Sequence, residues 1–136
     1  MVSEGMSKSY AMGAVLSLQF REAVSEVKLA LKEQGFGTLT EVDVRAVLKE
    51  KLGLEFRDYV ILGACNPQLS GKVLTADPEV GLVLPCNVVV YAEGDRTVVL
   101  IADPETMMAP LGKPSLDEVA QEAKVRLQRV IAALTG

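Results

Sequence analysis

The most constraining feature of this chain is a pair of apolar segments joined by a tight turn. The segments run from Val80 to Ala92 and from Val98 to Ala102, and the turn between them is Glu93-Gly94-Asp95. A turn of this kind joins neighbouring antiparallel strands, so the segments are predicted to form a hairpin. Both are apolar at almost every position, which is typical of strands buried on two faces. Pro85 lies within the first segment and requires an edge, a bulge or a break there.

Two segments with apolar residues at helical spacing can cover one face of the sheet. The first runs from Phe20 to Gln34, and Gly35 is expected to end it. The second follows Ser115-Leu116-Asp117-Glu118, which has the pattern of a capping box, and its apolar stripe continues to Leu134. Two helices cover only one face. The other face is therefore expected to pack on a second copy of the chain or to form a ligand cleft.

The remaining segments add strands and shorter helices. Strands are predicted from Tyr10 to Leu18, from Phe36 to Val42 and from Tyr59 to Ala64, and shorter helices from Val44 to Leu52, capped by Asp43, and from Gln68 to Leu74. Residues 1–9 lack periodicity and are predicted to be a disordered N-terminal tail before a single domain at residues 10–136. The order of elements and the antiparallel hairpin favour a two-layer α/β domain over a doubly wound one.

Composition excludes several classes of function. Eighteen acidic residues against fourteen basic ones give a net charge of -4, the wrong sign for binding nucleic acid through its phosphates. No apolar run approaches the ~20 residues that a membrane-spanning helix requires. Two cysteines are too few for a disulfide framework, and no signal segment opens the sequence. We therefore expect a cytoplasmic protein without a nucleic-acid or membrane partner.

The two cysteines of the chain lie in similar short motifs. These motifs are Gly63-Ala64-Cys65-Asn66-Pro67 and Leu84-Pro85-Cys86-Asn87-Val88, so an asparagine follows each cysteine. The chain has no histidine and no tryptophan, which leaves the thiols as almost its only soft, reactive groups. A function of this chain is therefore expected to concentrate on these two segments.

These motifs, together with a third, resemble those of a known family. The runs from Leu31 to Val44, from Tyr59 to Pro67 and from Gly81 to Val88 are similar, in this order, to the domain-of-unknown-function 302 family. The likeness covers nearly the whole chain from about Ala11 onward. It implies a small TATA-binding-protein-like α+β two-layer sandwich. In such a fold a curved, mainly antiparallel sheet of about five strands carries two long helices and shorter helices on one face. It also implies a homodimer. It implies no established activity, because the family is itself defined by unknown function, and the likeness to TATA-binding protein is one of architecture alone.

The candidate ligand-binding residues are Cys65, Asn66, Pro67, Cys86 and Asn87. Proline favours extended geometry in the residue before it, so Asn66 is expected at a strand end, where it caps the next helix or reaches a ligand. Each asparagine offers two donors and an acceptor in one plane, which suits it to orient a bound molecule. If the strands that hold the two cysteines are neighbours, both motifs line one region. The resulting hypothesis is a small-ligand or partner-binding domain.

The same residues admit two other interpretations. Free cysteines commonly pack as small apolar residues, which leaves a structural dimer module without a small-molecule site. Alternatively, a thiolate before a helix start, as at Cys65, serves redox chemistry, and two thiolates with Glu41 or Asp43 hold a metal. A Cys-His pair is excluded because the chain has no histidine. The residues do not decide whether the protein is an enzyme, and they assign no metal ligand and no cofactor.

The segment 103–114 is predicted to be a loop rich in proline, methionine and glycine. Met107 and Met108 lie within it. Methionine adapts to irregular surfaces, so these two side chains are expected to close over a pocket, to pack at a dimer contact or to be exposed.

Overall fold

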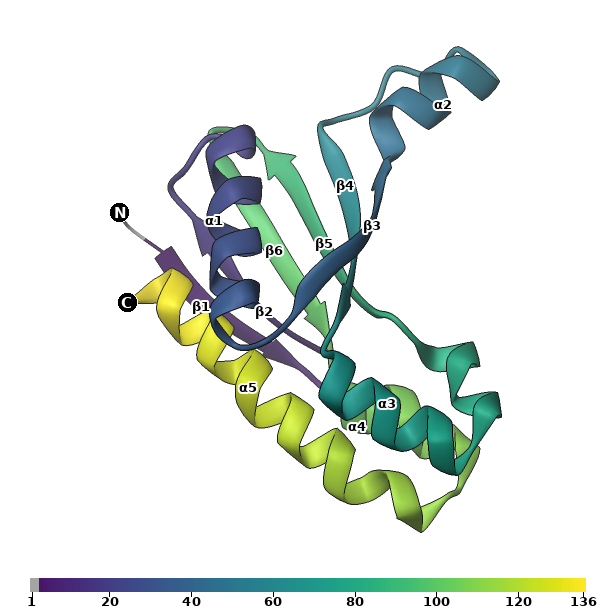
Figure 1. Cartoon of the computed structure of the whole chain (residues 1–136). Helices are drawn as coiled ribbons and strands as arrows, with labels where there is room; N and C mark the ends of the chain where they lie inside the picture. Colours follow the sequence, from purple (N-terminus) through teal and green to yellow (C-terminus); the bar gives the residue numbers. More distant parts are fainter. Residues whose placement is uncertain (1–2) are drawn as a thin grey trace.

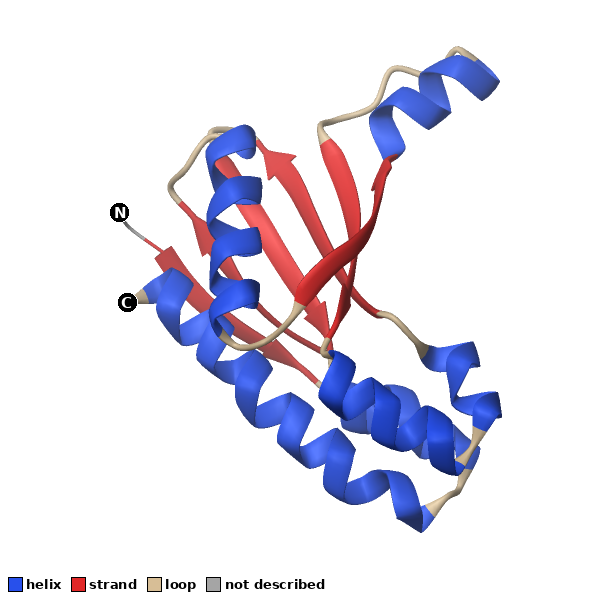
Figure 2. Ribbon diagram, in the orientation of Figure 1, coloured by secondary structure: helices blue, strands red, loops and turns tan. Residues whose placement is uncertain are grey.

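A computed structural model describes residues 3–136, and its centre is an antiparallel sheet (Figures 1 and 2). In these residues the sheet has six strands in the order β1-β2-β6-β5-β4-β3, and every neighbouring pair is antiparallel. The strands are β1 (Ser3–Lys8), β2 (Ala11–Leu16), β3 (Gly37–Asp43), β4 (Tyr59–Cys65), β5 (Cys86–Glu93) and β6 (Arg96–Ala102). The predicted hairpin is present as β5 and β6.

The helices pack mainly on one face of the sheet, as Figure 1 shows for α1 and α5. The α-helices are α1 (Phe20–Glu33), α2 (Val44–Leu52), α3 (Pro67–Ala76), α4 (Pro104–Met108) and α5 (Asp117–Thr135), and the 3-10 helices are η1 (Pro78–Val83), η2 (Ala109–Leu111) and η3 (Pro114–Leu116). This arrangement confirms the predicted α+β two-layer fold. Within residues 3–136, no helix is long and apolar enough to cross a membrane.

The main core lies between the sheet and helices α1 and α5. Alternate residues of the inner strands point toward these helices, because side chains alternate between the two faces of a strand. The largest fully buried side chains of the core are Leu16, Val27, Leu31, Leu62, Val88, Val90, Val99, Ile101, Leu127 and Val130. Burying a side chain of this size contributes about 1.5–3 kcal/mol to stability, so this layer is the main source of folding free energy.

The prediction of a disordered tail at residues 1–9 is wrong for Ser3–Lys8. These residues form β1, which pairs with β2 from Ser3 opposite Leu16 to Lys8 opposite Ala11. Residues 1 and 2 lie outside the described part of the chain. Strand formation at a sheet edge depends on ladder hydrogen bonds and on packing, here against α5. A small, polar segment without a regular pattern gives no sign of either.

Two further details differ from the sequence-based expectation. The predicted strand from Val80 to Ala92 begins with residues 80–83 in the 3-10 helix η1, and β5 starts only at Cys86. Pro85 therefore precedes the strand, with a cis peptide bond to Leu84, and produces a break, which is one of the three outcomes predicted for it. The predicted capping box at Ser115 is also wrong, because residues 114–116 form η3 and α5 starts without a side-chain cap.

Candidate functional site

The two cysteine motifs lie side by side at one end of the sheet. Strands β4 and β5 are neighbours, and Ala64 pairs with Cys86 while Gly63 pairs with Asn87. Neighbouring strands are about 4.8 Å apart and consecutive Cα atoms 3.8 Å, so the Cα atoms of Cys65 and Cys86 lie within about 10 Å of each other. The structure thus brings together the two segments that the sequence singles out.

The two thiols differ in their surroundings. Both are free, and the Sγ atom of Cys65 lies 3.0 Å from the hydroxyl oxygen of Ser70 in α3. Burial raises the pKa of the Cys86 thiol to about 11, and the nearby Cys65 adds to this effect. Cys86 is therefore protonated at neutral pH. Side-chain alternation points the two cysteines to opposite faces of the sheet, which disfavours a disulfide between them.

Asn66 caps helix α3 and is itself buried, with an exposed fraction of 4%. Its Oδ1 atom accepts a hydrogen bond from the Leu69 backbone N–H at 3.2 Å, and the exposed Pro67 occupies the first helical position. The amide also packs against Gly35, where a Cβ atom would lie 2.9 Å from Asn66 Nδ2. The structural role predicted for Asn66 is confirmed. Ligand contact by Asn66 or Pro67 stays a prediction.

A surface pocket of about 350 Å³ opens beside the second motif, and we call it the Cys86 pocket. Strands β5 and β6 contribute Cys86, Asn87 and Ala102, while the chain before β5 and the helix α4 contribute the rest. The complete lining is Leu82, Val83, Leu84, Pro85, Cys86, Asn87, Ala102, Pro104, Met107 and Met108. Eight of these ten residues are apolar, so the polar chemistry of the pocket comes from one thiol and one amide.

The helix α4, which supplies the two methionines, is held in place by its N-cap residue, Asp103. Asp103 is buried and caps α4, and its Oδ1 atom accepts hydrogen bonds from the N–H groups of Glu105 and Thr106 at 2.9 and 3.2 Å. Lys124 of α5 forms an ion pair with Asp103 at 2.9 Å, and hydrogen bonding to Asp103 raises the pKa of Lys124. The predicted loop is therefore partly helical, and α4 holds Met107 against the pocket.

The other wall of the pocket, at Pro85, packs tightly on strand β4. Gly63 lies beneath Pro85 and beside Thr40 of β3, and it leaves no room for a side chain. A Cβ atom at Gly63 would lie 2.8 Å from Pro85 Cγ and even closer to the Thr40 hydroxyl. This close approach of three segments explains why glycine precedes Ala64 in the first motif.

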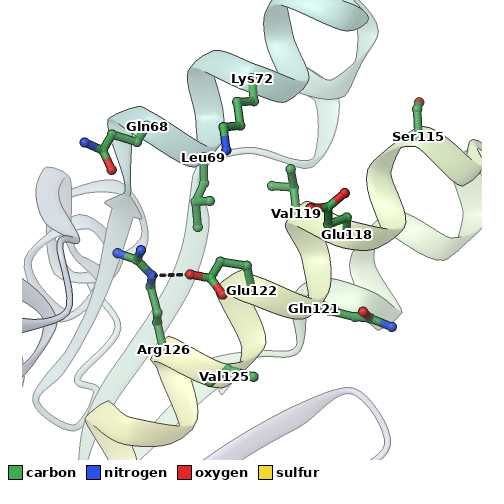
Figure 3. A pocket seen from close by; sticks show the side chains of 10 residues that line it. All are labelled: Gln68, Leu69, Lys72, Ser115, Glu118, Val119, Gln121, Glu122, Val125 and Arg126. Carbon is green, nitrogen blue, oxygen red and sulfur yellow. Dashed lines mark hydrogen bonds and ion pairs between the residues drawn. The ribbon is translucent and has the colours of Figure 1, made fainter.

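A second, larger hollow of about 840 Å³ lies between α3 and α5 (Figure 3). Its lining consists of Gln68, Leu69, Lys72, Ser115, Glu118, Val119, Gln121, Glu122, Val125 and Arg126. Figure 3 shows Arg126 paired with Glu122, whose Oε1 atom accepts from Arg126 Nε at 3.1 Å. Two acidic and two basic side chains share this groove. It therefore favours neither anions nor cations.

The oxygen ligands proposed for a metal lie away from the thiols. Glu41 pairs with Lys28 at 2.6 Å, and Asp43 caps α2 by accepting from the Ala46 N–H at 3.0 Å. Their strand partners are Leu62 and Val60, three and five residues before Cys65. Among the described residues, no three His, Cys, Asp or Glu side chains gather as a metal site would require.

Several pocket residues were missing from the sequence-based site. Leu84, Ala102 and Pro104 line the Cys86 pocket, but each comes from a different segment and none has a chemically distinctive side chain. The one available signal was the strand pairing of the hairpin. Counting back from its turn places Ala102 close to Asn87, because Ile101 pairs with Val88.

The fold and this pocket define a small α+β domain with an antiparallel sheet and a hollow at one end. The chain belongs to the family described as Domain of unknown function DUF302, which matches residues 13–134. It is similar to the crystal structure of an uncharacterized conserved protein DUF302 from Bacillus stearothermophilus. The two share 32% sequence identity and a TM-score of 0.85, over 93% of this chain and 99% of that one. No curated protein matches the chain.

Proposed function

We propose that this protein binds a small, neutral and largely apolar molecule in the Cys86 pocket. The observation that carries the proposal is the lining, in which eight of the ten residues are apolar and Cys86 and Asn87 are the two polar ones. Ligand sites are typically concave and mostly apolar, with a few polar groups that fix orientation, and volumes start near 300 Å³. The Cys86 pocket, at about 350 Å³, meets each of these criteria.

The chemistry of the lining narrows the class of ligand. No lining residue carries a charge, so a charged ligand would lose its hydration without gaining an opposite charge. The Asn87 amide donates and accepts hydrogen bonds, which favours a ligand with an amide or carbonyl group. At protein-like packing density, a volume of about 350 Å³ holds roughly 15 non-hydrogen atoms.

The protonated state of Cys86 supports binding over thiol chemistry. A thiol is a much weaker nucleophile than a thiolate, and burial holds the pKa of Cys86 near 11. Cys86 then serves the pocket as an apolar wall and a weak hydrogen-bond donor. The redox or metal-handling alternative requires deprotonated thiols that meet, and no observation favours it. Free cysteines suit the reducing cytoplasm that we propose as the location.

Two probes of nearly equal shape test the proposal, 1-naphthamide and 1-methylnaphthalene. Each is titrated into the 15N-labelled protein, and binding is followed through the amide shifts of Asn87 and Ala102. We expect both to bind and the amide probe to bind about 5–10-fold more tightly, because one added hydrogen bond contributes about 1 kcal/mol. Absence of shifts at these residues up to millimolar probe would refute the proposed function.

Three variants locate the binding. Ala102→Leu fills the pocket and should weaken both probes at least tenfold, whereas Ala109→Leu, an equal change on the exposed helix η2, should weaken neither. Asn87→Leu keeps the apolar volume and should remove only the preference for the amide probe. Equal binding by the Ala102 and Ala109 variants would place the probes elsewhere and contradict the proposal.

A further inference from the structure

The connection between β3 and β4 stands away from the rest of the molecule. It consists of residues 44–58, and we call it the arm. Figure 1 shows its helix α2 projecting beyond the far ends of β3 and β4, on the opposite side from the Cys86 pocket. None of the nine residues of α2 is buried. Val44 and Leu48 are half-buried and α2 contacts β4, so within the described residues the amphipathic face that predicted this helix is covered only in part.

An isolated helix of this length does not sustain itself in water. Helices shorter than about 12–15 residues are marginal even with favourable sequences, and most helical stability in proteins comes from packing an apolar face. Asp43 caps α2 at one end and Gly53, with a φ of 64°, ends it at the other. These caps contribute about 1 kcal/mol each to the stability of the helix. The helix therefore needs further packing of its apolar face.

The arm and the adjoining strand expose one set of large apolar side chains. These are Leu39, Val42, Val47, Leu52, Leu54 and Phe56, and we call them the arm surface. Leu39 and Leu52 are the most exposed of them, at 68% and 72%. Strand β3 is also an edge strand, at the end of the sheet order. An apolar edge of this kind is a ready site for pairing with another chain.

Four of the seven charged residues of the arm are paired with each other. Arg45 forms an ion pair with Asp58 at 2.8 Å, and Lys49 forms one with Glu55 at 3.1 Å. Covering the arm surface therefore leaves these charges with partners. The six residues together expose roughly 600 Å² per chain, so complete cover in a two-fold contact would bury up to about 1,200 Å² of them, which reaches the lower bound of stable interfaces.

We propose that the arm surface binds the arm surface of a second copy of the chain around a two-fold axis. A two-fold contact uses the same patch on both partners, which a single self-complementary apolar surface satisfies. A second copy of the chain is also present wherever the protein is made. It can therefore pack against the short helix α2 at all times.

Light scattering coupled to size exclusion tests this dimer, with one variant and one matched control. The wild-type protein should have twice its chain mass of 14.6 kDa at micromolar concentration. Leu52→Glu places a charge in each half of the contact and should weaken the dimer at least 100-fold. Leu29→Glu makes the same change at a leucine of α1 that is 57% exposed and lies outside the arm surface, and it should leave the dimer intact.

Hydrogen exchange keeps the test decisive if Leu52→Glu fails to fold. In the wild-type protein, the amides of α2 should exchange more slowly as protein concentration rises, since only the dimer covers them. A monomeric wild-type protein would overturn the proposal. So would a dimer that both glutamate variants retain equally, or exchange in α2 that does not depend on concentration.

Discussion

Replacing Gly63 by alanine tests the tight packing behind the Cys86 pocket. Two effects oppose each other in this substitution. Alanine restricts the unfolded chain more than glycine does, which stabilises a protein by about 0.4–1 kcal/mol where the backbone accepts it. Against this, the new methyl group would lie 2.8 Å from Pro85 Cγ and collide with the Thr40 hydroxyl. Overpacking of this kind costs about 1–3 kcal/mol, so the net expected loss of stability is about 1–2 kcal/mol.

The sign of the change in unfolding free energy shows whether steric crowding or the restriction of the unfolded chain dominates at Gly63. Gly71, within helix α3, has no atom within 4 Å of the position that a Cβ would take. Gly71→Ala should therefore stabilise the protein by about 0.5–1 kcal/mol, the usual gain for alanine over glycine inside a helix. If Gly63→Ala also stabilises the protein, the close approach of Gly63, Thr40 and Pro85 is wrong.

Urea unfolding followed by circular dichroism measures both changes, since the chain has no tryptophan to report by fluorescence. All samples are compared at one protein concentration, because the proposed dimer would make the midpoint depend on it. Thr40→Ala removes the hydroxyl that collides with the new methyl group. In a double-mutant cycle it should recover about 1 kcal/mol of the loss caused by Gly63→Ala. A coupling energy of zero would contradict the contact with Thr40.

Two further predictions concern the first motif and the buried thiol. Asn66→Ala should lower the unfolding free energy by about 1–2 kcal/mol in urea titrations, and Asp43→Ala, which removes a cap from the exposed helix α2, by about 0.5 kcal/mol. Equal losses would show that the burial of Asn66 adds nothing. The raised pKa of Cys86 means that above pH 9 the unfolded chain releases a proton which the folded chain retains up to about pH 11. Stability should therefore fall between pH 9 and 11, and Cys86→Ala should reduce this slope.

The sequence predicted those parts of the fold in which periodicity and local chemistry agree. Helix α1 buries Ala23, Val27, Ala30 and Leu31, which is the stripe expected from its spacing, and a glycine follows its end. Strand β1 and the 3-10 helix η1 were not predicted, because their local sequence does not indicate the structure that they adopt. The first depends on ladder bonds to β2, and the second is an apolar segment whose length and composition also suit a strand.

Some features of the candidate site could be predicted from the sequence and others could not. Placing Cys86 beside the first motif required only that two strands be neighbours, and the pairing of Ala64 with Cys86 confirms it. Asn66 was recognisable as a cap because proline follows it. The pocket itself was beyond sequence reasoning, since its walls come from a proline-linked 3-10 segment and from α4. The position of α4 depends on the ion pair between Asp103 and Lys124.

The helix α2 and the Cys86 pocket lie at opposite ends of strand β4. Leu39 of the arm surface lies nearer the first motif, because its neighbours Thr38 and Thr40 pair with Ala64 and Gly63. Strand β4 leaves the arm at Tyr59 and reaches the first motif at Cys65. Its seven residues span about 20 Å, a distance longer than most side-chain contacts can bridge. A dimer contact at α2 would therefore lie at the end of β4 away from the Cys86 pocket. The two proposals can be tested separately, because the Leu52→Glu variant retains every residue that lines the pocket.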